Sequence, residues 1–364
     1  MMGSSAPAVL ANSPAELVEI NESDLPEVFR FIARQSHEAE AGVEARLRWL
    51  VLENPARESA TPLGWGLRAS TGAFVGCILC VPQKFRSQQQ EFVLMGSTSF
   101  YVDEAYRGRG GLVFLRYSQL NRRWALFGNS ANAEAAQLWK ARGAIPVGHS
   151  DHELLGVIRW RPLIEDLVLR NVQNRGLARL ASGVIAPLVS PLQRPRTGSA
   201  ESGELLPLAS ANQVMNLPLS EVGSKITAVR DLPYIRWRYF SGRDASVAAF
   251  AFRSRKLDKD ILVTVNQRNR GRLGQLRTLN VLDVYPEVTP LWHAAIVSAL
   301  LRRYRESVDA VVLRGQDADR QRVFREMGFV RRGFEAPNAW FLDRFSLIPR
   351  CEWYLVPADG DWLI

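Results

Sequence analysis

The chain has 364 residues, of which 47% are hydrophobic, and this length favours two domains over one. Its net charge of +9 favours acidic ligands such as coenzyme A, a nucleotide-linked sugar, RNA or an anionic membrane, although a well-solvated basic surface accounts for it equally well. Three cysteines are too few for a disulfide scaffold, and no apolar run reaches the ~20 residues of a membrane span. The first 14 residues lack the basic and apolar regions of a secretory signal, so we expect a cytoplasmic protein.

The first elements alternate between strand and helix patterns. A strand and then a helix are predicted within 17–34, and a hairpin of two strands is predicted at 64–69 and 74–81. Cys77 and Cys80 in the second of these strands have the spacing of a metal or redox pair. An offset of three places the two thiols on opposite faces of a strand. We therefore expect buried structural cysteines and no metal site.

A glycine-rich loop at 107–111 follows a strand-like run at 97–102 and opens a segment with helical apolar spacing. A strand, a glycine loop and a helix in this order aim several backbone N–H groups and a helix N-terminus at one point, where a pyrophosphate can be held. Glycines also serve ordinary tight turns, so the loop alone leaves that alternative open. We interpret it as the site of a phosphate-bearing cofactor.

A second motif lies downstream of this loop. Residues 132–143 form an alanine-rich helix ended by glycine, after a short strand at 124–127. Together the two motifs resemble the GNAT acyltransferase superfamily, in which the pattern Arg/Gln-x-x-Gly-x-Gly/Ala follows the fourth strand and wraps the pyrophosphate of coenzyme A. Arg107 and Gly110 match this pattern, whereas Leu112 stands where the family usually has glycine or alanine. The resemblance implies an α/β fold with a mixed sheet and acyl-CoA as co-substrate.

The resemblance also implies roles for particular residues. The backbone of residues 100–102 would pair with the pantetheine arm of the cofactor, and one of its N–H groups would polarise the thioester carbonyl. Asn132 would help to hold the arm. The implied cofactor-binding residues are Phe100, Tyr101, Val102, Arg107, Gly108, Arg109, Gly110, Gly111 and Asn132.

Residues for proton transfer are less clearly marked. GNAT enzymes often protonate the departing thiolate with a tyrosine on the second motif's helix, but Trp139 occupies the matching position, and its indole is no useful acid near neutral pH. His149, in a polar cluster just after this helix, could relay a proton, although a polar loop explains the cluster as well. Asp283 and Tyr285 lie on the strand of the second half that corresponds to the acceptor-facing strand, with a solvated edge as the alternative. The candidate catalytic residues are therefore His149, Asp283 and Tyr285.

The plan of the first half returns in the second. Residues 317–329 repeat the alanine-rich helix motif at one constant offset, and the Arg-Trp pair at 48–49 recurs within 235–239. We expect the two tryptophans of these pairs to pack in the core or between domains. In place of the glycine loop, 284–290 contains two prolines that remove N–H donors. A basic run at 268–272 precedes no helix and is predicted to be a hairpin turn.

Between the halves lies an amphipathic stretch with interspersed arginines, followed by a Pro/Gly/Ser-rich connector. The predicted organisation is a first GNAT domain at 1–160, a helical linker at 161–210 and a degenerate GNAT-like domain at 211–364. The linker helix could lie on an anionic membrane surface, but a helix that packs between the two domains needs no extra assumption.

The leading functional hypothesis is transfer of an acyl group from acyl-CoA to an amine, or to a hydroxyl, bound between the two domains. An alternative is a Fem-type transferase that uses aminoacyl-tRNA, which would explain the basic surface but would not need the glycine loop. A third is a non-catalytic acyl-CoA-binding protein, which the missing tyrosine favours. The Arg-Trp segments and the ending at 352–362 look like tandem GNAT proteins of bacterial polysaccharide and cell-envelope biosynthesis, so the expected acceptor is a small amine or amino sugar rather than a nucleic acid.

Overall fold

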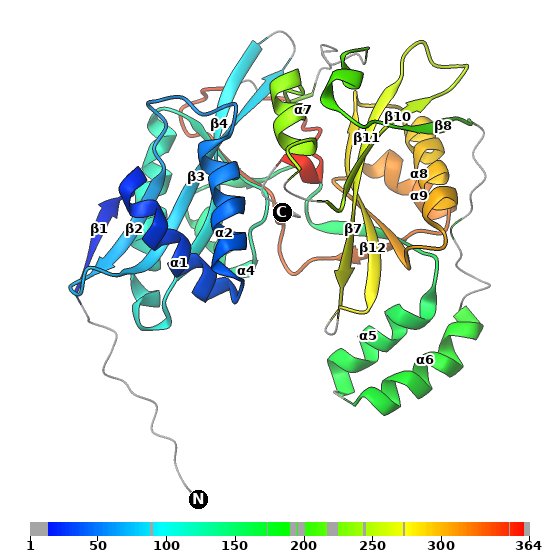
Figure 1. The fold of residues 1–364 in the computed structure, drawn as a ribbon, viewed down its shortest axis with the longest axis horizontal. Helices are drawn as coiled ribbons and strands as arrows, with labels where there is room; N and C mark the ends of the chain where they lie inside the picture. Colours follow the sequence, from blue (N-terminus) through cyan, green and yellow to red (C-terminus); the bar gives the residue numbers. More distant parts are fainter. Residues whose placement is uncertain are drawn as a thin grey trace, which may run out of the picture.

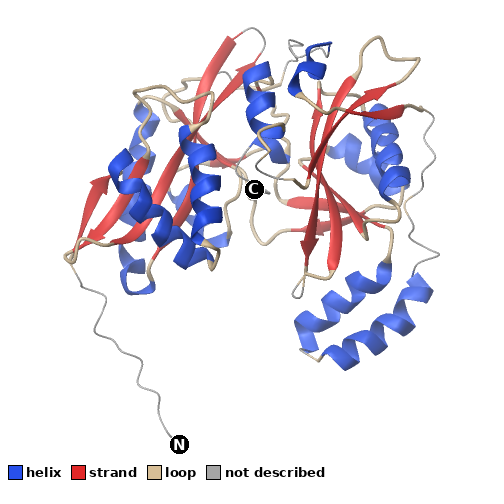
Figure 2. Cartoon of the chain, viewed as in Figure 1, coloured by secondary structure: helices blue, strands red, loops and turns tan. Residues whose placement is uncertain are grey.

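The computed structural model describes residues 14–87, 90–172, 174–189, 195, 201–216, 225–242, 245–271, 274–348 and 350–359. Two mixed β-sheets, each covered by helices, lie side by side (Figures 1 and 2). The predicted α/β class with two similar halves is confirmed. Among the described residues, no helix is long and apolar enough to cross a membrane.

The first sheet has the strand order β1-β2-β3-β4-β5-β15-β6, with β9 paired to β3. All of its pairs are antiparallel except β4 with β5. The bounds are Ala15–Glu19 for β1, Gly64–Ala69 for β2, Phe74–Ser87 for β3, Gln90–Val102 for β4, Ala125–Gly128 for β5, Ile145–Pro146 for β6, Thr227–Ala228 for β9 and Trp340–Leu342 for β15.

Helices cover both faces of this sheet. On one face, α1 and α2 pack against Cys77 and its neighbours on β3; on the other, α3 and α4 pack against the side of β3 that contains Cys80. The two thiols are buried on opposite faces, as the spacing predicted, and burial raises the pKa of each. The helices are Leu25–Ser36 for α1, Glu40–Leu47 for α2, Gly110–Ser118 for α3 and Ala133–Ala141 for α4.

The second sheet repeats this plan in the order β14-β7-β13-β12-β11-β10-β8, with β12 and β13 parallel. Helices α8 and α9 cover one face and α7 covers the other. The bounds are His152–Val157 for β7, Glu204–Pro207 for β8, Val247–Arg253 for β10, Ile261–Arg270 for β11, Leu276–Tyr285 for β12, Ala310–Arg314 for β13, Val330–Gly333 for β14, Leu232–Tyr239 for α7, Pro290–Tyr304 for α8 and Ala318–Glu326 for α9. The basic run expected to be a turn links β11 to β12, although Arg272 lies outside the described residues.

Strands of each half join the sheet of the other: the first half contributes β7, and the second contributes β15 and the short β9. Strand β7 follows β6 in the chain but lies between β13 and β14 of the second sheet, and β15 returns to lie between β5 and β6 of the first. A division at residue 160 therefore separates β7 from the strands with which it pairs. Composition and motif spacing follow chain order, whereas sheet membership depends on pairing, so the exchange is not visible in the sequence.

The segment between the halves forms a helical hairpin of α5, Trp160–Val172, and α6, Arg175–Val189. Helix α5 packs through Leu163 against Leu155, Val157, Leu276 and Val312 of the second sheet. The hairpin projects from that half, away from the first sheet (Figure 1). The expectation of a helix packed between the two domains is wrong, because both helices attach to one half. Most of the Pro/Gly/Ser-rich connector lies outside the described residues.

Candidate active site

Strands β4 and β5 separate after a short paired stretch. They pair in parallel only from Leu94–Ala125 to Gly96–Phe127, while β4 continues to Val102 with β3 on its other side. Beyond Gly96, none of the described strands pairs with the side of β4 that faces β5. Such an edge can bind an extended chain that carries amide groups. The pantetheine arm of coenzyme A is a chain of this kind.

A β-bulge lies in this edge at Ser99. The register shifts between the pairs Leu79–Thr98 and Cys77–Tyr101, so two residues of β4 oppose one residue of β3. Ser99 has a left-handed backbone with φ of 53°, and its carbonyl accepts the Cys77 thiol at 3.4 Å. A bulge changes the direction of the backbone groups beside it. Nothing in the sequence marks Ser99, since serine is not a typical residue for positive φ.

The predicted cofactor loop forms a 3₁₀ helix, Glu104–Arg109, that continues directly into α3. Gly108 and Gly111 are exposed, and a Cβ added at either would meet nothing within 4 Å. Their backbone can therefore be approached closely by a ligand at the N-terminus of α3. Arg107 is also exposed at this end.

Two residues of the loop serve the fold instead. A Cβ at Gly110 would lie 3.3 Å from Cγ2 of Val102, so this glycine allows α3 to pack closely on β4. The Arg109 guanidinium donates a hydrogen bond of 2.8 Å to the carbonyl of Ala15 at the start of β1. The loop residues best placed to receive a diphosphate are therefore Arg107, Gly108 and Gly111.

An aromatic cluster lies where α3 and α4 meet the two separating strands. The centre of the Phe114 ring is 5.2 Å from that of Trp139 and 6.0 Å from that of Phe100. The Tyr117 hydroxyl donates a hydrogen bond of 2.7 Å to the carbonyl of Met95. The Trp139 indole lies against Gly128 at the end of β5, where a Cβ would be 2.8 Å from the ring. Burial raises the pKa of Tyr117 well above its usual value. Neither aromatic side chain is suited to protonating a thiolate.

The predicted residue Asn132 is the N-cap of α4, where its side-chain oxygen accepts the N–H of Ala135 at 2.8 Å. Asp317 caps α9 in the same way. The repeat seen in the sequence therefore includes a helix start that both copies preserve. The role of Asn132 toward the cofactor stays a prediction.

The candidates Asp283 and Tyr285 are buried in the second half. Asp283 is 0% exposed, and its Oδ2 accepts hydrogen bonds from Nε of Arg230 at 2.9 Å and from the Tyr239 hydroxyl at 2.6 Å. The Arg230 guanidinium also lies 5.4 Å from the Tyr285 ring centre and donates to Asp359. These contacts give Asp283 and Tyr285 a structural explanation and leave neither open to an acceptor. Strand alternation placed Asp283 on a face but gave no sign of Arg230, which is distant in sequence.

His149 is exposed, with a left-handed φ of 51°, whereas the neighbouring His152 is buried at 2% exposure. Nδ1 of His152 lies 2.7 Å from Oδ1 of Asp151, and its buried Nε2 has no hydrogen-bond partner among the described residues. His152 lines a small pocket with Asn129 at the end of β5 and Arg314 at the end of β13. A histidine that is paired with Asp151 and lines a pocket built from both halves was not singled out in the sequence, where Asp151 and His152 belong to the same polar cluster as His149.

The residue after His152 is a buried carboxylate with three arginine partners. Glu153, fully buried beside His152, forms ion pairs with Arg314 at 2.6 Å, Arg332 at 2.6 Å and Arg270 at 3.5 Å. Burial lowers the pKa of Arg314 to about 9, although Glu153 opposes this shift. In the described parts of the chain, no three His, Cys, Asp or Glu side chains gather as metal ligands would.

No protein-family model and no curated protein matches the sequence. Solved structures do match the fold. A probable N-acyltransferase of Enterococcus faecalis V583 has a TM-score of 0.55 at 9% identity, covering 91% of this chain and 72% of its own. A GCN5-related N-acetyltransferase of Anabaena variabilis has a TM-score of 0.54 at 12% identity, covering 90% of this chain and 72% of its own.

A third similar structure is the N-myristoyltransferase of Saccharomyces cerevisiae with bound myristoyl-CoA. It has a TM-score of 0.54 at 12% identity and covers 93% of this chain and 80% of its own. Identities this low carry information on the fold alone. The chain has the GNAT fold of these N-acyltransferases.

Proposed function

We propose that this protein transfers an acyl group from acyl-CoA to an amine, or to a hydroxyl, with the cofactor bound by the first half. The observation that carries the proposal is the bulge in β4 at the place where β5 has separated from it, followed directly by the open glycines at the start of α3. This combination provides backbone donors for a diphosphate and an edge for the pantetheine amides in one line. In the second half, Pro286 and Pro290 stand where that loop would be.

The acceptor is proposed to bind at the pocket between the halves. When Nδ1–H of His152 is donated to Asp151, Nε2 keeps a lone pair that can accept a proton from the attacking amine. The nitrogen of the amine forms a bond to the thioester carbon while the carbon–sulfur bond breaks. A backbone N–H beside the Ser99 bulge would stabilise the oxyanion. A thiol with a pKa near ~8.5 is a fair leaving group, and water can protonate the thiolate.

Two other functions compete with acyl transfer from acyl-CoA. A non-catalytic acyl-CoA-binding protein is favoured by Tyr117 and Trp139, neither of which offers a proton. A Fem-type transferase is favoured by the net charge of +9. An amino-sugar acceptor and a role in cell-envelope synthesis are proposed from the resemblance alone; the ending at 352–362 extends beyond the described residues, and Asp361 and Trp362 lie outside them.

The loop is tested with the substitution Gly111→Glu. A carboxylate in the first turn of α3 favours the helix dipole, so stability should hold or rise by about 0.3–1 kcal/mol, whereas repulsion should weaken acyl-CoA binding at least about tenfold. Gly111→Ala is the matched control for the added side chain: its Cβ meets no protein atom within 4 Å, so the fold should be unchanged, and the further loss of affinity from Gly111→Ala to Gly111→Glu measures the effect of the charge. Calorimetric titration with acetyl- and longer-chain CoA measures both. Equal affinity in Gly111→Glu and the wild type would remove the loop from the proposal.

Turnover distinguishes the alternatives. Release of free CoA with a panel of amines and amino sugars is expected for the enzyme. Binding without release supports the non-catalytic alternative, and binding of aminoacyl-tRNA without acyl-CoA supports the Fem-type one.

A further inference from the structure

Helix α6 presents its large apolar side chains to solvent. Leu180, Val184 and Leu188 are 69%, 66% and 68% exposed, and Leu177 and Ile185 are also exposed. Their spacing of three and four residues places them on one face of the helix. The buried positions of α6 are instead the small residues Ala178, Ser182 and Ala186.

This arrangement is the reverse of an ordinary surface helix, which buries large apolar side chains and exposes polar ones. The small residues allow α6 to pack closely on α5, where Leu167 and Val172 are exposed as well. The hairpin projects from the second half, so the apolar face of α6 is not covered by either sheet (Figure 1). An exposed row of large apolar side chains of this kind marks a binding surface.

The charge of the hairpin indicates what covers the surface. Residues 160–189 contain four arginines and two acidic residues, and α6 itself has no acidic residue. Arg161, Arg175 and Arg179 are exposed, and Nε of Arg179 lies 3.7 Å from Oε1 of Glu165 on α5. On α6 the two arginines lie on the side opposite to the exposed leucines, and a helix with one apolar face and one cationic face matches the interface of a bilayer that contains anionic lipids. A helix of 15 residues is too short to span the membrane, so it would lie in the interface.

We propose that the α5–α6 hairpin docks the protein on the surface of an anionic phospholipid bilayer, with Leu180, Val184 and Leu188 entering the interface. This proposal is independent of acyl transfer, because it uses no residue of the cofactor edge or of the His152 pocket. It would hold the two sheets beside the membrane without a spanning segment.

The test is flotation of the full chain with vesicles of phosphatidylcholine alone or with added phosphatidylglycerol. The wild type should bind the anionic vesicles, less so at high salt. Leu180→Glu combined with Val184→Glu should reduce this binding at least about tenfold without lowering the melting temperature, because both side chains are exposed. Leu291→Glu combined with Phe345→Glu, at apolar positions elsewhere that are 53% and 57% exposed, is the control and should bind like the wild type.

Three results would overturn the proposal. They are absence of wild-type binding to the anionic vesicles, equal binding to both kinds of vesicle, and a wild-type dimer in light scattering that the Leu180→Glu, Val184→Glu variant converts to a monomer. The last result would identify a second copy of the chain as the occupant of the surface. Arg175→Ser with Arg179→Ser should weaken binding to the anionic vesicles only.

Discussion

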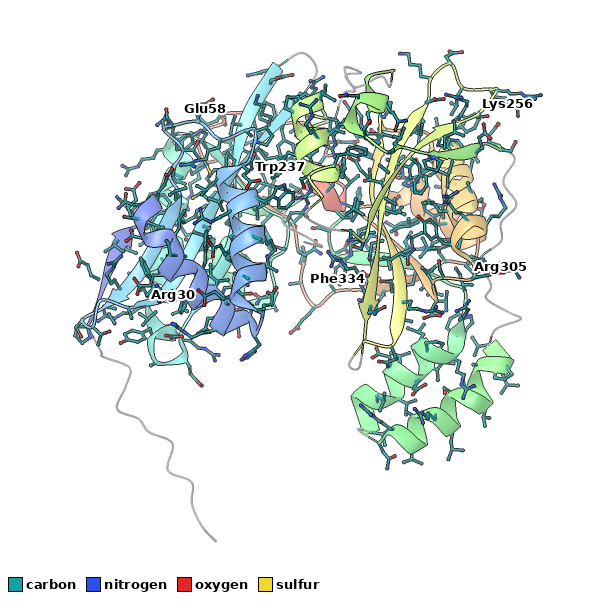
Figure 3. The ribbon with its side chains drawn as sticks, viewed as in Figure 1. Arg30, Glu58, Trp237, Lys256, Arg305 and Phe334 are labelled. Carbon is teal, nitrogen blue, oxygen red and sulfur yellow. The ribbon has the colours of Figure 1, made fainter. Side chains whose placement is uncertain are left out.

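Trp49 and Trp237 join the two halves through a reciprocal pair of hydrogen bonds. Each indole Nε1 donates to the backbone carbonyl of the other residue at 3.0 Å, and the two rings stack with their centres 4.7 Å apart. The Arg238 guanidinium lies over both rings. Trp237 lies between the halves in Figure 3. The expectation that the repeated Arg-Trp segments pack in the core or between domains is confirmed, and the contact follows the symmetry of the repeat.

This pair should couple the stabilities of the halves. Replacing either tryptophan by phenylalanine removes one indole donor and part of the stacking, at a cost of about 1–2 kcal/mol in the free energy of unfolding. The double variant Trp49→Phe, Trp237→Phe should cost less than the sum of the two single variants, by about 0.5–1.5 kcal/mol. Urea unfolding of the four proteins measures this coupling. Strict additivity would show that the two rings do not interact in solution.

The His152 dyad makes a prediction about catalysis. His152→Asn should lower kcat by about 10²–10⁴-fold and leave the KM for acyl-CoA nearly unchanged, because the histidine is proposed to act on the acceptor. His149→Asn is the control on an exposed side chain and should retain activity. Steady-state rates across a series of pH values measure both effects. The reverse outcome, loss in His149→Asn alone, would move the base to the residue that the sequence first suggested.

Tyr117 is expected to matter for stability and not for turnover. Tyr117→Phe leaves the buried carbonyl of Met95 without its donor, at a cost of about 1–3 kcal/mol. Trp139→Phe should likewise leave turnover nearly intact, since no proton transfer is assigned to it. Thermal melts and rates on the same samples separate the two effects. A loss of turnover with unchanged stability would make Tyr117 the missing general acid.

The buried charges of the second half make a prediction about pH. Arg230 faces two carboxylates, and burial raises the pKa of Asp359 to about 6, while Arg230 opposes the shift. The folded state therefore binds a proton more readily than the unfolded state. The contribution of Asp359 to stability is largest below a pH of about 4 and decreases as the pH rises toward 6, a change of at most about 3 kcal/mol.

Denaturant unfolding between pH 4 and pH 7 tests this sign. The free energy of unfolding of the wild type minus that of Asp359→Asn should fall as the pH rises, because the wild type loses stability when Asp359 ionises and the asparagine does not titrate. Arg230→Met should be the more damaging substitution, at about 3–5 kcal/mol near pH 7, because it leaves two carboxylates buried together. If the free energy of unfolding of the wild type minus that of Asp359→Asn rose with pH instead, the raised pKa of Asp359 would be contradicted.

The sequence predictions that the structure confirms rest on residues that are close together in the chain. The glycine-ended helix at 132–143 and its copy could be predicted because helix propensity and a terminal glycine depend on neighbouring residues, whereas the N-caps Asn132 and Asp317 were found only in the structure. The opposite faces of Cys77 and Cys80 followed from the geometry of a strand. The absence of a glycine loop at 284–290 could also be predicted, because Pro286 and Pro290 remove backbone N–H donors at their own positions.

What the sequence did not indicate depends on distant partners. The exchange of β7 and β15, the Arg230 contacts that bury Asp283, and the Arg109 bond to Ala15 each join segments far apart in the chain. The bulge at Ser99 depends on the register with β3, which no local pattern fixes. His152 could not be distinguished from His149 in their polar cluster, because its burial comes from the exchanged strand that it begins.

Hydrogen–deuterium exchange with and without acyl-CoA tests the central claim most directly, because the repeat supplies an internal control. If the first half binds the cofactor, backbone amides at 97–111 should become protected on addition of the ligand, and those at 281–290 should not change. Protection at 281–290 instead, or no protection in either segment at saturating acyl-CoA, would contradict the account.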